Sequence, residues 1–319
     1  MDLRTIQEAR ALIKQYVCPS RLVPAPSLST LSGAEVYLKL ESEGPTSAFK
    51  PRGAIYSLSE RLDRGPLKGV VTASSGNHGA AVAFAARVLD CSATIFLPQN
   101  PNPIKRHRIV QQGAKIVECG KFLEESRQAA AKYAAEHELY NIIDGETEGL
   151  TIGAGTIGCE ILEQLPRVHE IIVPVGDSSL IRGLAFAVKQ QKPDVRIIGV
   201  QAERAPAYYR SWLERRPMST DFSDTIADGL ATRHASPTNV RDLLELVDDM
   251  KLVADQQMLK AMWQLLAGEG VFSEPAGAAS TAALLDRGNV HAGKVVVLLV
   301  TGANAPPSIL KQAFQLSPQ

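Results

Sequence analysis

Gly44-Pro45-Thr46-Ser47-Ala48-Phe49-Lys50-Pro51-Arg52-Gly53 places one lysine between an aromatic residue and a proline. A lysine that faces solvent usually lies on the polar face of a helix, whereas Phe49 and Pro51 favour a side chain that points into a partly apolar, rigid corner. Partial burial there makes the amine of Lys50 a better nucleophile. The alternative is an ordinary surface lysine in a loop, and the rest of the chain has to decide between the two.

The bulk composition indicates a folded protein that acts on small molecules. Hydrophobic residues make up 45% of the 319 residues, enough to fill the cores of two lobes. Lysine plus arginine equals aspartate plus glutamate at 34 each, so no overall field recruits nucleic acid or an anionic membrane. The longest strongly apolar run, Val295–Val300, is too short to cross a bilayer, and residues 1–15 lack a signal-peptide core. We expect a cytoplasmic protein with a small, partly charged ligand.

The cysteines and histidines show no spacing that is typical of a metal site or a disulfide framework. The four cysteines contain no Cys-x-x-Cys pair, and the six histidines contain no His-Glu-x-x-His pattern. We therefore predict reduced thiols and no catalytic metal.

Apolar periodicity predicts a regular alternation of strands and helices. The expected strands are 35–40, 69–72, 93–97, 115–118, 170–175, 195–200 and 294–300. The expected helices are 3–16, 53–62, 79–89, 103–112, 123–138, 156–164, 180–190, 255–266 and 276–285, while 205–225 is expected to be irregular. Alternation of this kind predicts parallel sheets, and the last strand is expected to join the second sheet. The fold class is therefore α/β with two lobes, each an open sheet, and a cleft between them.

Two strand-to-helix turns have the composition of anion sites. Ser74-Ser75-Gly76-Asn77-His78-Gly79 follows the strand that ends at Thr72, and its small residues, hydroxyls and backbone N–H groups at a helix start would cradle a carboxylate. Val175-Gly176-Asp177-Ser178-Ser179-Leu180 follows a second strand and can bind one phosphate. Each turn can equally be a simple capped helix start, and Asp177 favours that alternative because its carboxylate repels an anion. His78 can likewise take part in binding or catalysis, or be a packed residue at the helix start.

The lysine segment and these turns resemble the fold-type II pyridoxal-phosphate enzymes, specifically the serine/threonine dehydratases and serine racemase. Residues 45–54 look like the Schiff-base lysine segment of that family, and Ser74–Gly79 is similar to its substrate-carboxylate loop. Four further segments match in the same order: 153–158, 225–229, 274–278 and 301–304. The resemblance covers nearly the whole chain and implies the two-lobed fold of the tryptophan synthase β-subunit type.

The resemblance also implies roles for particular residues. Lys50 would hold pyridoxal 5'-phosphate as a Schiff base and remove the α-proton of the substrate, with Phe49 packed beside it. The cofactor would further contact Asn77, the backbone of Gly176, Asp177, Ser178, Ser179 and Leu180 through its phosphate, and Thr301 through its ring nitrogen. The substrate carboxylate would bind Ser74, Ser75, Gly76, Asn77 and His78. A hydroxyl partner leaves the ring nitrogen neutral, which favours loss of a β-substituent over transamination.

The chain departs from the family pattern at several positions. The phosphate loop of the family is commonly a run of glycines, and here it contains Asp177, Ser178 and Ser179. Ser47-Ala48 stand where the dehydratases usually have Gly-Ser. Ser75 is alanine in many dehydratases and serine in serine racemases, where it would protonate the opposite face. Gln201 and Ala207 fall where some relatives place carboxylate ligands for a divalent cation, so an activating metal is not expected.

The predicted function is a dehydratase that removes water from a β-hydroxy-α-amino acid and yields a 2-oxo acid and ammonia. Serine, threonine, phenylserine and hydroxyaspartate types all remain open as substrates. A serine-type racemase is the first alternative, because of Ser75, and a non-catalytic amino-acid or cofactor sensor is the second. The predicted domains are residues 1–62 with 147–319, which bind the cofactor, and 63–146, which bind the substrate. The resemblance suggests a homodimer.

Overall fold

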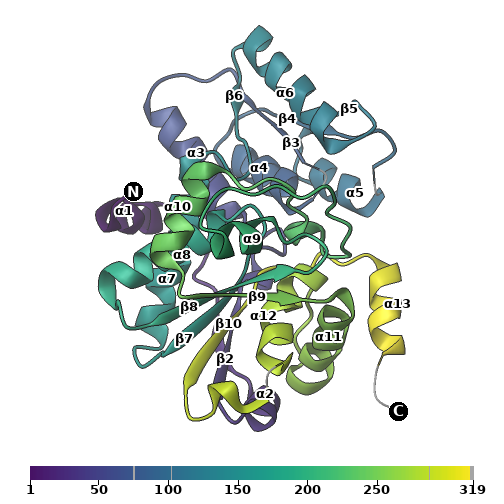
Figure 1. Ribbon diagram of the computed structural model, residues 1–319. Coiled ribbons are helices and arrows are strands. Elements are labelled where there is room, and N and C mark those ends of the chain that lie inside the picture. The colour runs from purple at the N-terminus through teal and green to yellow at the C-terminus, as the bar shows by residue number, and fades with distance from the viewer. Residues whose placement is uncertain (75, 102, 287, 317–319) are drawn as a thin grey trace. The chain divides into compact units, whose positions relative to one another are not determined.

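Strands and helices alternate along the chain and form two sheets, each within its own compact unit (Figure 1). The description rests on a computed structural model, in which residues 1–74, 76–101, 103–286 and 288–316 are described. The first unit comprises Met1–Cys18 and Gly44–Ala154, and the second comprises Pro19–Glu43 and Gly155–Gln319. The units place residues 1–18, 44–62 and 147–154 with the smaller sheet, whereas the sequence analysis assigned them to the larger domain. The assignment of the domains to substrate and cofactor stays a prediction.

The first unit is built on a four-stranded parallel sheet with the order β5-β4-β3-β6. Its strands are β3 (Val70–Ala73), β4 (Ala93–Leu97), β5 (Lys115–Glu118) and β6 (Tyr140–Asn141). Its helices are α1 (Leu3–Ile13), α3 (Pro51–Asp63), α4 (Asn77–Val88), α5 (Pro103–Gln111) and α6 (Leu123–His137). Alanines of α6, Ala130 and Ala134, pack with Val71 and Phe96 of the sheet. Because the strands are parallel, β3 and β6 end at the same edge of the sheet.

The second unit is built on a six-stranded sheet with the order β1-β2-β10-β7-β8-β9. Only the pairing of β1 with β2 is antiparallel. The strands are β1 (Leu22–Pro24), β2 (Glu35–Leu40), β7 (Glu170–Pro174), β8 (Arg196–Ala202), β9 (Asp249–Val253) and β10 (Val295–Val300). Every residue of β10 is buried, as expected for a strand with both neighbours paired and both faces covered.

Helices of the second unit cover its sheet. They are α2 (Pro26–Ser32), α8 (Ser179–Gln191), α9 (Ala207–Leu213), α10 (Pro237–Leu246), α11 (Asp255–Glu269), α12 (Pro275–Asp286) and α13 (Pro307–Gln315), with short 3-10 helices η1 (Glu41–Glu43), η2 (Asp228–Leu230) and η3 (Gly288–His291). The alanine-rich α12 is buried from Pro275 to Leu284 and packs on β7, β8, β9 and β10. Its small side chains let it lie close to the strands. The helix α7 (Glu148–Gln164) begins in the first unit and ends in the second.

The predicted α/β class with parallel sheets is confirmed, and β10 joins the larger sheet as expected. Two predictions of local structure are wrong. The helix expected at 156–164 begins at Glu148, and the segment expected to be irregular contains α9. Within the described residues, no helix is long and apolar enough to cross a membrane.

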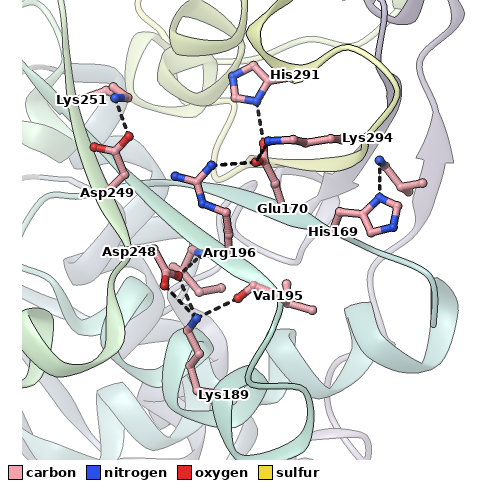
Figure 2. Close-up of polar contacts among 12 residues, drawn as sticks. His169, Glu170, Lys189, Val195, Arg196, Asp248, Asp249, Lys251, His291 and Lys294 are labelled. Atoms are coloured by element: carbon pink, nitrogen blue, oxygen red, sulfur yellow. Dashed lines mark hydrogen bonds and ion pairs between the residues drawn. The ribbon is translucent and has the colours of Figure 1, made fainter.

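A buried carboxylate lies at the N-terminal ends of the central strands of the larger sheet (Figure 2). Glu170 begins β7 and is 1% exposed. Its Oε1 accepts from Lys294 Nζ at 2.5 Å and from Arg196 Nη1 at 3.0 Å, and its Oε2 lies 2.5 Å from His291 Nδ1. Burial alone would raise the pKa of Glu170, but His291 and Lys294 lower it to about 2. The network ties β7, β8 and the chain entering β10 to one another.

Candidate active site

Lys50 is held at the start of α3 by a tight turn. The backbone N–H of Ser47 donates to Gly44 O at 2.8 Å, and Ser47 has a left-handed φ of 53°. Pro51 is the first residue of α3, where its fixed φ suits a helix start and its missing N–H costs nothing. The amine of Lys50 lies 5.5 Å from the centre of the Phe49 ring, and the side chain is 16% exposed. The predicted partly apolar corner is therefore what the structure has.

Glycines let α3 and the start of α7 cross at backbone contact. A Cβ built on Gly53 would lie 2.7 Å from Leu150 Cα, and one on Gly153 would lie 2.5 Å from Gly53 Cα. One turn further along α3 the helices are equally close, because a Cβ on Gly149 would lie 2.7 Å from Ser57 Cα. Real Cβ atoms do not approach so closely, so only glycine fits at these positions. The crossing fixes the helix that carries Lys50.

The amine of Lys50 forms an ion pair with Asp144, which follows β6. Lys50 Nζ donates to Asp144 Oδ1 at 2.7 Å and to Oδ2 at 2.6 Å, and the Asp144 side chain is 20% exposed. His78 Nδ1 lies 3.6 Å from Asp144 Oδ1. The other ring nitrogen, Nε2, lies 3.1 Å from Thr72 Oγ1 and 3.2 Å from Ile142 O. A lysine, a carboxylate and an imidazole are therefore neighbours at the carboxyl ends of β3 and β6.

The turn from Ser74 to Gly79 follows β3 in the same unit. Gly76 N–H donates to Ser74 Oγ at 3.3 Å, and α4 begins at Asn77. A Cβ on Gly79 would lie 2.5 Å from Ser74 O, which explains the glycine at this close approach. The predicted Ser74, Gly76, Asn77 and His78 thus belong to one helix start, while Ser75 lies outside the described residues. The ring of His78 is buried against Thr72 and Ile142.

The turn after β7 in the second unit presents two buried hydroxyls at the N-terminus of α8. Ser178 has a left-handed φ of 76°, and Ser178 and Ser179 are buried. Among the described residues, neither Oγ atom has a hydrogen-bond partner. Buried hydroxyls normally have partners, so this pair points to a ligand that accepts hydrogen bonds. Leu180, in the first turn of α8, is buried as well.

Asp177 is engaged within this turn. Its Oδ1 accepts from Ser179 N at 3.1 Å, and its backbone O accepts from Asn239 Nδ2 at 3.3 Å. Asn239 also donates to the hydroxyl of Tyr208 at 3.0 Å. A Cβ on Gly176 would lie 2.1 Å from Gly229 O, so a glycine is required there. The sequence did not identify Asn239 or Tyr208, because their role depends on helices α9 and α10, which it did not predict.

Thr301 follows β10, and hydrogen bonds connect the residues after it to Glu274, which directly precedes α12. Glu274 N–H donates to Gly302 O at 2.9 Å, and Glu274 Oε2 accepts from Asn304 N at 3.1 Å. A Cβ on Gly277 would lie 2.5 Å from Gly302 O. These contacts hold the buried Thr301 at the carboxyl end of its strand, where α/β enzymes place functional groups.

Gln201 is one of the two residues from which the sequence analysis predicts that no activating metal binds. It is fully buried on β8, and its Oε1 accepts from Tyr209 N at 2.8 Å. In the parts of the chain that the structure describes, no group of three or more His, Cys, Asp or Glu side chains is arranged to hold a metal. The absence of a catalytic metal stays a prediction.

Comparisons with known proteins agree on the family to which the chain is similar. The family described as "Pyridoxal-phosphate dependent enzyme" matches residues 13–302. The chain is 33% identical to the L-threonine ammonia-lyase of Thermotoga maritima over 95% of its own length and 76% of that protein. It is 35% identical to a catabolic L-threonine dehydratase of Staphylococcus aureus, covering 95% of this chain and 89% of the relative.

The fold is similar to that of maize serine racemase. The two structures superpose with a TM-score of 0.92 at 30% sequence identity, over 98% of this chain and 97% of the racemase. This likeness and the match over residues 13–302 confirm the predicted fold type, the pyridoxal-phosphate cofactor and an enzymatic activity. The chain belongs to the family of pyridoxal-phosphate dependent enzymes.

Proposed function

We propose that this enzyme is a dehydratase that converts a β-hydroxy-α-amino acid into a 2-oxo acid and ammonia. The observation that carries the proposal is the amine of Lys50, held at the start of α3 beside the helix start that presents Ser74 and Asn77. The names of the threonine ammonia-lyase and threonine dehydratase relatives support this activity.

Each unit, taken by itself, offers groups that fit pyridoxal phosphate. In the first unit, Lys50 supplies a primary amine for the aldehyde and Asn77 an amide for the ring. In the second unit, the N-terminus of α8 and the unpartnered hydroxyls of Ser178 and Ser179 are donors for a phosphate. Thr301 supplies a hydroxyl that can meet a ring nitrogen without protonating it.

When bound, pyridoxal phosphate supplies an electron-accepting ring that makes the α-proton of an amino acid removable. Lys50 takes that proton as a base and, as an ammonium, can donate it to the departing β-hydroxyl. Ser74 and the backbone N–H groups at the start of α4 bind the substrate carboxylate. Water leaves in the elimination and is taken up again when the enamine hydrolyses, so the net products are a 2-oxo acid and ammonia.

The proposal is tested by incubating the full-length protein, loaded with pyridoxal phosphate, with serine, threonine, phenylserine and hydroxyaspartate stereoisomers. We expect 2-oxo acid and ammonia in equal amounts from at least one of them. Lys50→Ala should lower the rate by roughly 10²–10⁴-fold. Lys68→Ala is the matched control, because Lys68 lies on the surface in an ion pair with Glu138. A cofactor-loaded protein that releases no 2-oxo acid from any of these compounds would refute the dehydratase.

A serine-type racemase is the second candidate, favoured by the similarity to maize serine racemase. Chiral chromatography of the same L-serine incubation separates the two reactions: D-serine without 2-oxo acid supports the racemase, and 2-oxo acid alone supports the dehydratase. The comparisons give no support to a non-catalytic sensor, because the chain belongs to an enzyme family.

We further propose, from the family resemblance, that the enzyme is a homodimer and works in the cytoplasm. Sedimentation of the purified protein tests the dimer, which is expected at twice the chain mass of 34.3 kDa.

A further inference from the structure

We propose that Asp144 and His78 form a proton-sharing unit with Lys50, in which Asp144 is a positioning residue for the amine. Asp144 holds Lys50 as an ammonium, and His78 accepts the proton when Lys50 becomes a neutral amine. This inference rests on the proposed function for the part that the amine plays in catalysis. The contacts themselves are observed within the first unit.

The contact between Lys50 and Asp144 is a short ion pair that engages both carboxylate oxygens. Both carboxylate oxygens lie within 2.7 Å of Nζ, so the two bonds are charge-assisted. The side chains are only 16% and 20% exposed, which weakens screening by solvent relative to a surface pair. This geometry favours the ammonium form and fixes the direction in which the amine points.

The contacts of His78 assign the proton on its neutral ring. Ile142 O can only accept, so the nitrogen 3.2 Å away, Nε2, carries the hydrogen. Thr72 Oγ1 donates to Ile142 O at 2.6 Å and can accept from the same nitrogen. The neutral ring therefore presents Nδ1 as its basic atom, and Nδ1 is the nitrogen that lies 3.6 Å from Asp144 Oδ1.

These positions define a balanced proton transfer. The N–H bond that breaks is on Lys50 Nζ and the bond that forms is on His78 Nδ1, and Asp144 Oδ1 lies 2.7 Å from the first atom and 3.6 Å from the second. The trio has no net charge before or after the transfer, because one carboxylate faces one cation in both states. A transfer that keeps the net charge constant avoids leaving the partly buried carboxylate of Asp144 unpaired.

The charged groups nearest in sequence to Lys50 and Asp144 are Arg52 on α3, which is buried, and Glu146 and Glu148, which are exposed. Glu148 lies 3.7 Å from the N-terminal amine. Glu146 serves as the control, because it is a carboxylate on the same loop that takes no part in the trio.

The test measures how readily Lys50 reacts with acetic anhydride in full-length protein from which the cofactor has been removed by treatment with hydroxylamine and dialysis. Acetylation at neutral pH is quantified by peptide mass spectrometry relative to Lys132, which is exposed. Asp144→Asn should raise the reactivity of Lys50 on the order of tenfold, because the ammonium loses its carboxylate. His78→Gln keeps a donor at the Nε2 position but cannot take up the proton, so it should lower the reactivity.

Opposite signs for these variants distinguish proton sharing from loss of packing, which would shift both in one direction. Asp144→Glu should stay near the wild type, Glu146→Gln should equal it, and His78→Gln should have no further effect in the Asp144→Asn background. Unchanged reactivity in Asp144→Asn overturns the proposal. If Asp144→Asn does not fold, a normal or raised reactivity in His78→Gln overturns it.

The outcome is independent of turnover. A protein that shows opposite shifts but releases no 2-oxo acid keeps the proton-sharing unit and loses the proposed dehydratase. A protein that releases 2-oxo acid but shows no shift keeps the dehydratase and loses the proton-sharing unit.

Discussion

The buried hydroxyls of Ser178 and Ser179 destabilise the cofactor-free protein and would bind the phosphate of the cofactor in the loaded one. An unpartnered buried hydroxyl is destabilising, whereas a hydrogen bond to a charged phosphate is worth about 1.5–3 kcal/mol. Ser179→Ala should therefore weaken pyridoxal-phosphate binding by roughly 10- to 100-fold. The same change should leave the cofactor-free protein equally stable or more stable. Titration of the dialysed protein and its thermal unfolding measure the two effects.

Ser178→Ala should behave in the same way, because serine and alanine are equally strained at a φ of 76°. Ser59→Ala is the control: its hydroxyl is also buried and unpartnered among the described residues, but it lies on α3 and not in the turn. Ser59→Ala should leave the affinity for the cofactor unchanged. Equal affinity losses at Ser59 and Ser179 would contradict a phosphate site at the turn.

At the scale of single residues, the sequence indicated Lys50 but missed Asp144. Lys50 was identifiable because its neighbours in the chain, Phe49 and Pro51, form the corner around it. Asp144 is separated from Lys50 by 94 positions and follows β6, a strand of only two residues that leaves no alternating pattern. Only the sheet brings the ends of β3 and β6 together, so the proton-sharing unit could not be found from spacing along the chain.

At the scale of the elements, the crossing of α3 and α7 determines where Lys50 lies. Gly53→Ala would push a Cβ against the backbone of Leu150 at 2.7 Å. Overpacking of this kind costs about 1–3 kcal/mol, and displacement of the start of α3 would move the amine. We expect both a lower unfolding midpoint in urea and a dehydratase rate reduced by up to about 10²-fold.

Gly149→Ala is a matched control for that change. Its Cβ would meet Ser57 Cα at the same 2.7 Å, but at a point seven residues along the chain from Lys50. The two variants should therefore lose similar stability while Gly53→Ala loses more activity. Equal activity at equal stability would show that the crossing supports the fold without positioning the amine.

The elements that the sequence predicted well are those with a strong local pattern. The buried strands β4 and β10 and the helices α4 and α12 have continuous apolar or alanine-rich runs. The start of α7 was missed because glycines at 149, 153 and 155 disfavour a helix locally, although the close crossing requires those at 149 and 153. Tertiary contact overrides propensity in this segment.

At the scale of the whole molecule, ionisation at the strand starts of the larger sheet sets a pH dependence of stability. Glu170 has a pKa of about 2 in the folded state, lowered by His291 and Lys294 against the effect of burial, and an ordinary glutamate has 4.5. A lowered folded pKa contributes stability above the unfolded value that is lost as the pH falls through the folded value. The contribution, on the order of 2 kcal/mol, should disappear between pH 4.5 and about 2.

Glu170→Gln should remove this contribution and leave Arg196 on β8, His291 on η3 and Lys294 beside β10 without their carboxylate (Figure 2). The variant should be less stable than the wild type at pH 7, and the difference should shrink as the pH falls below 4.5. Trp212 and Trp263 are the two tryptophans of the chain and belong to the unit that contains Glu170, so their fluorescence reports its urea unfolding.

Glu35→Gln separates the effect of burial from that of a lowered pKa. The bond from Arg167 lowers the pKa of Glu35 to about 2 as well, but the Glu35 side chain is 48% exposed at the start of β2. Solvent and salt screen an exposed pair, so its removal should change stability little at any pH. In 1 M KCl the loss in Glu170→Gln should persist, because the buried carboxylate is less screened. Losses of equal size in both variants would mean that the lowered pKa alone, and not burial beside Arg196, His291 and Lys294, determines the acid stability of this unit.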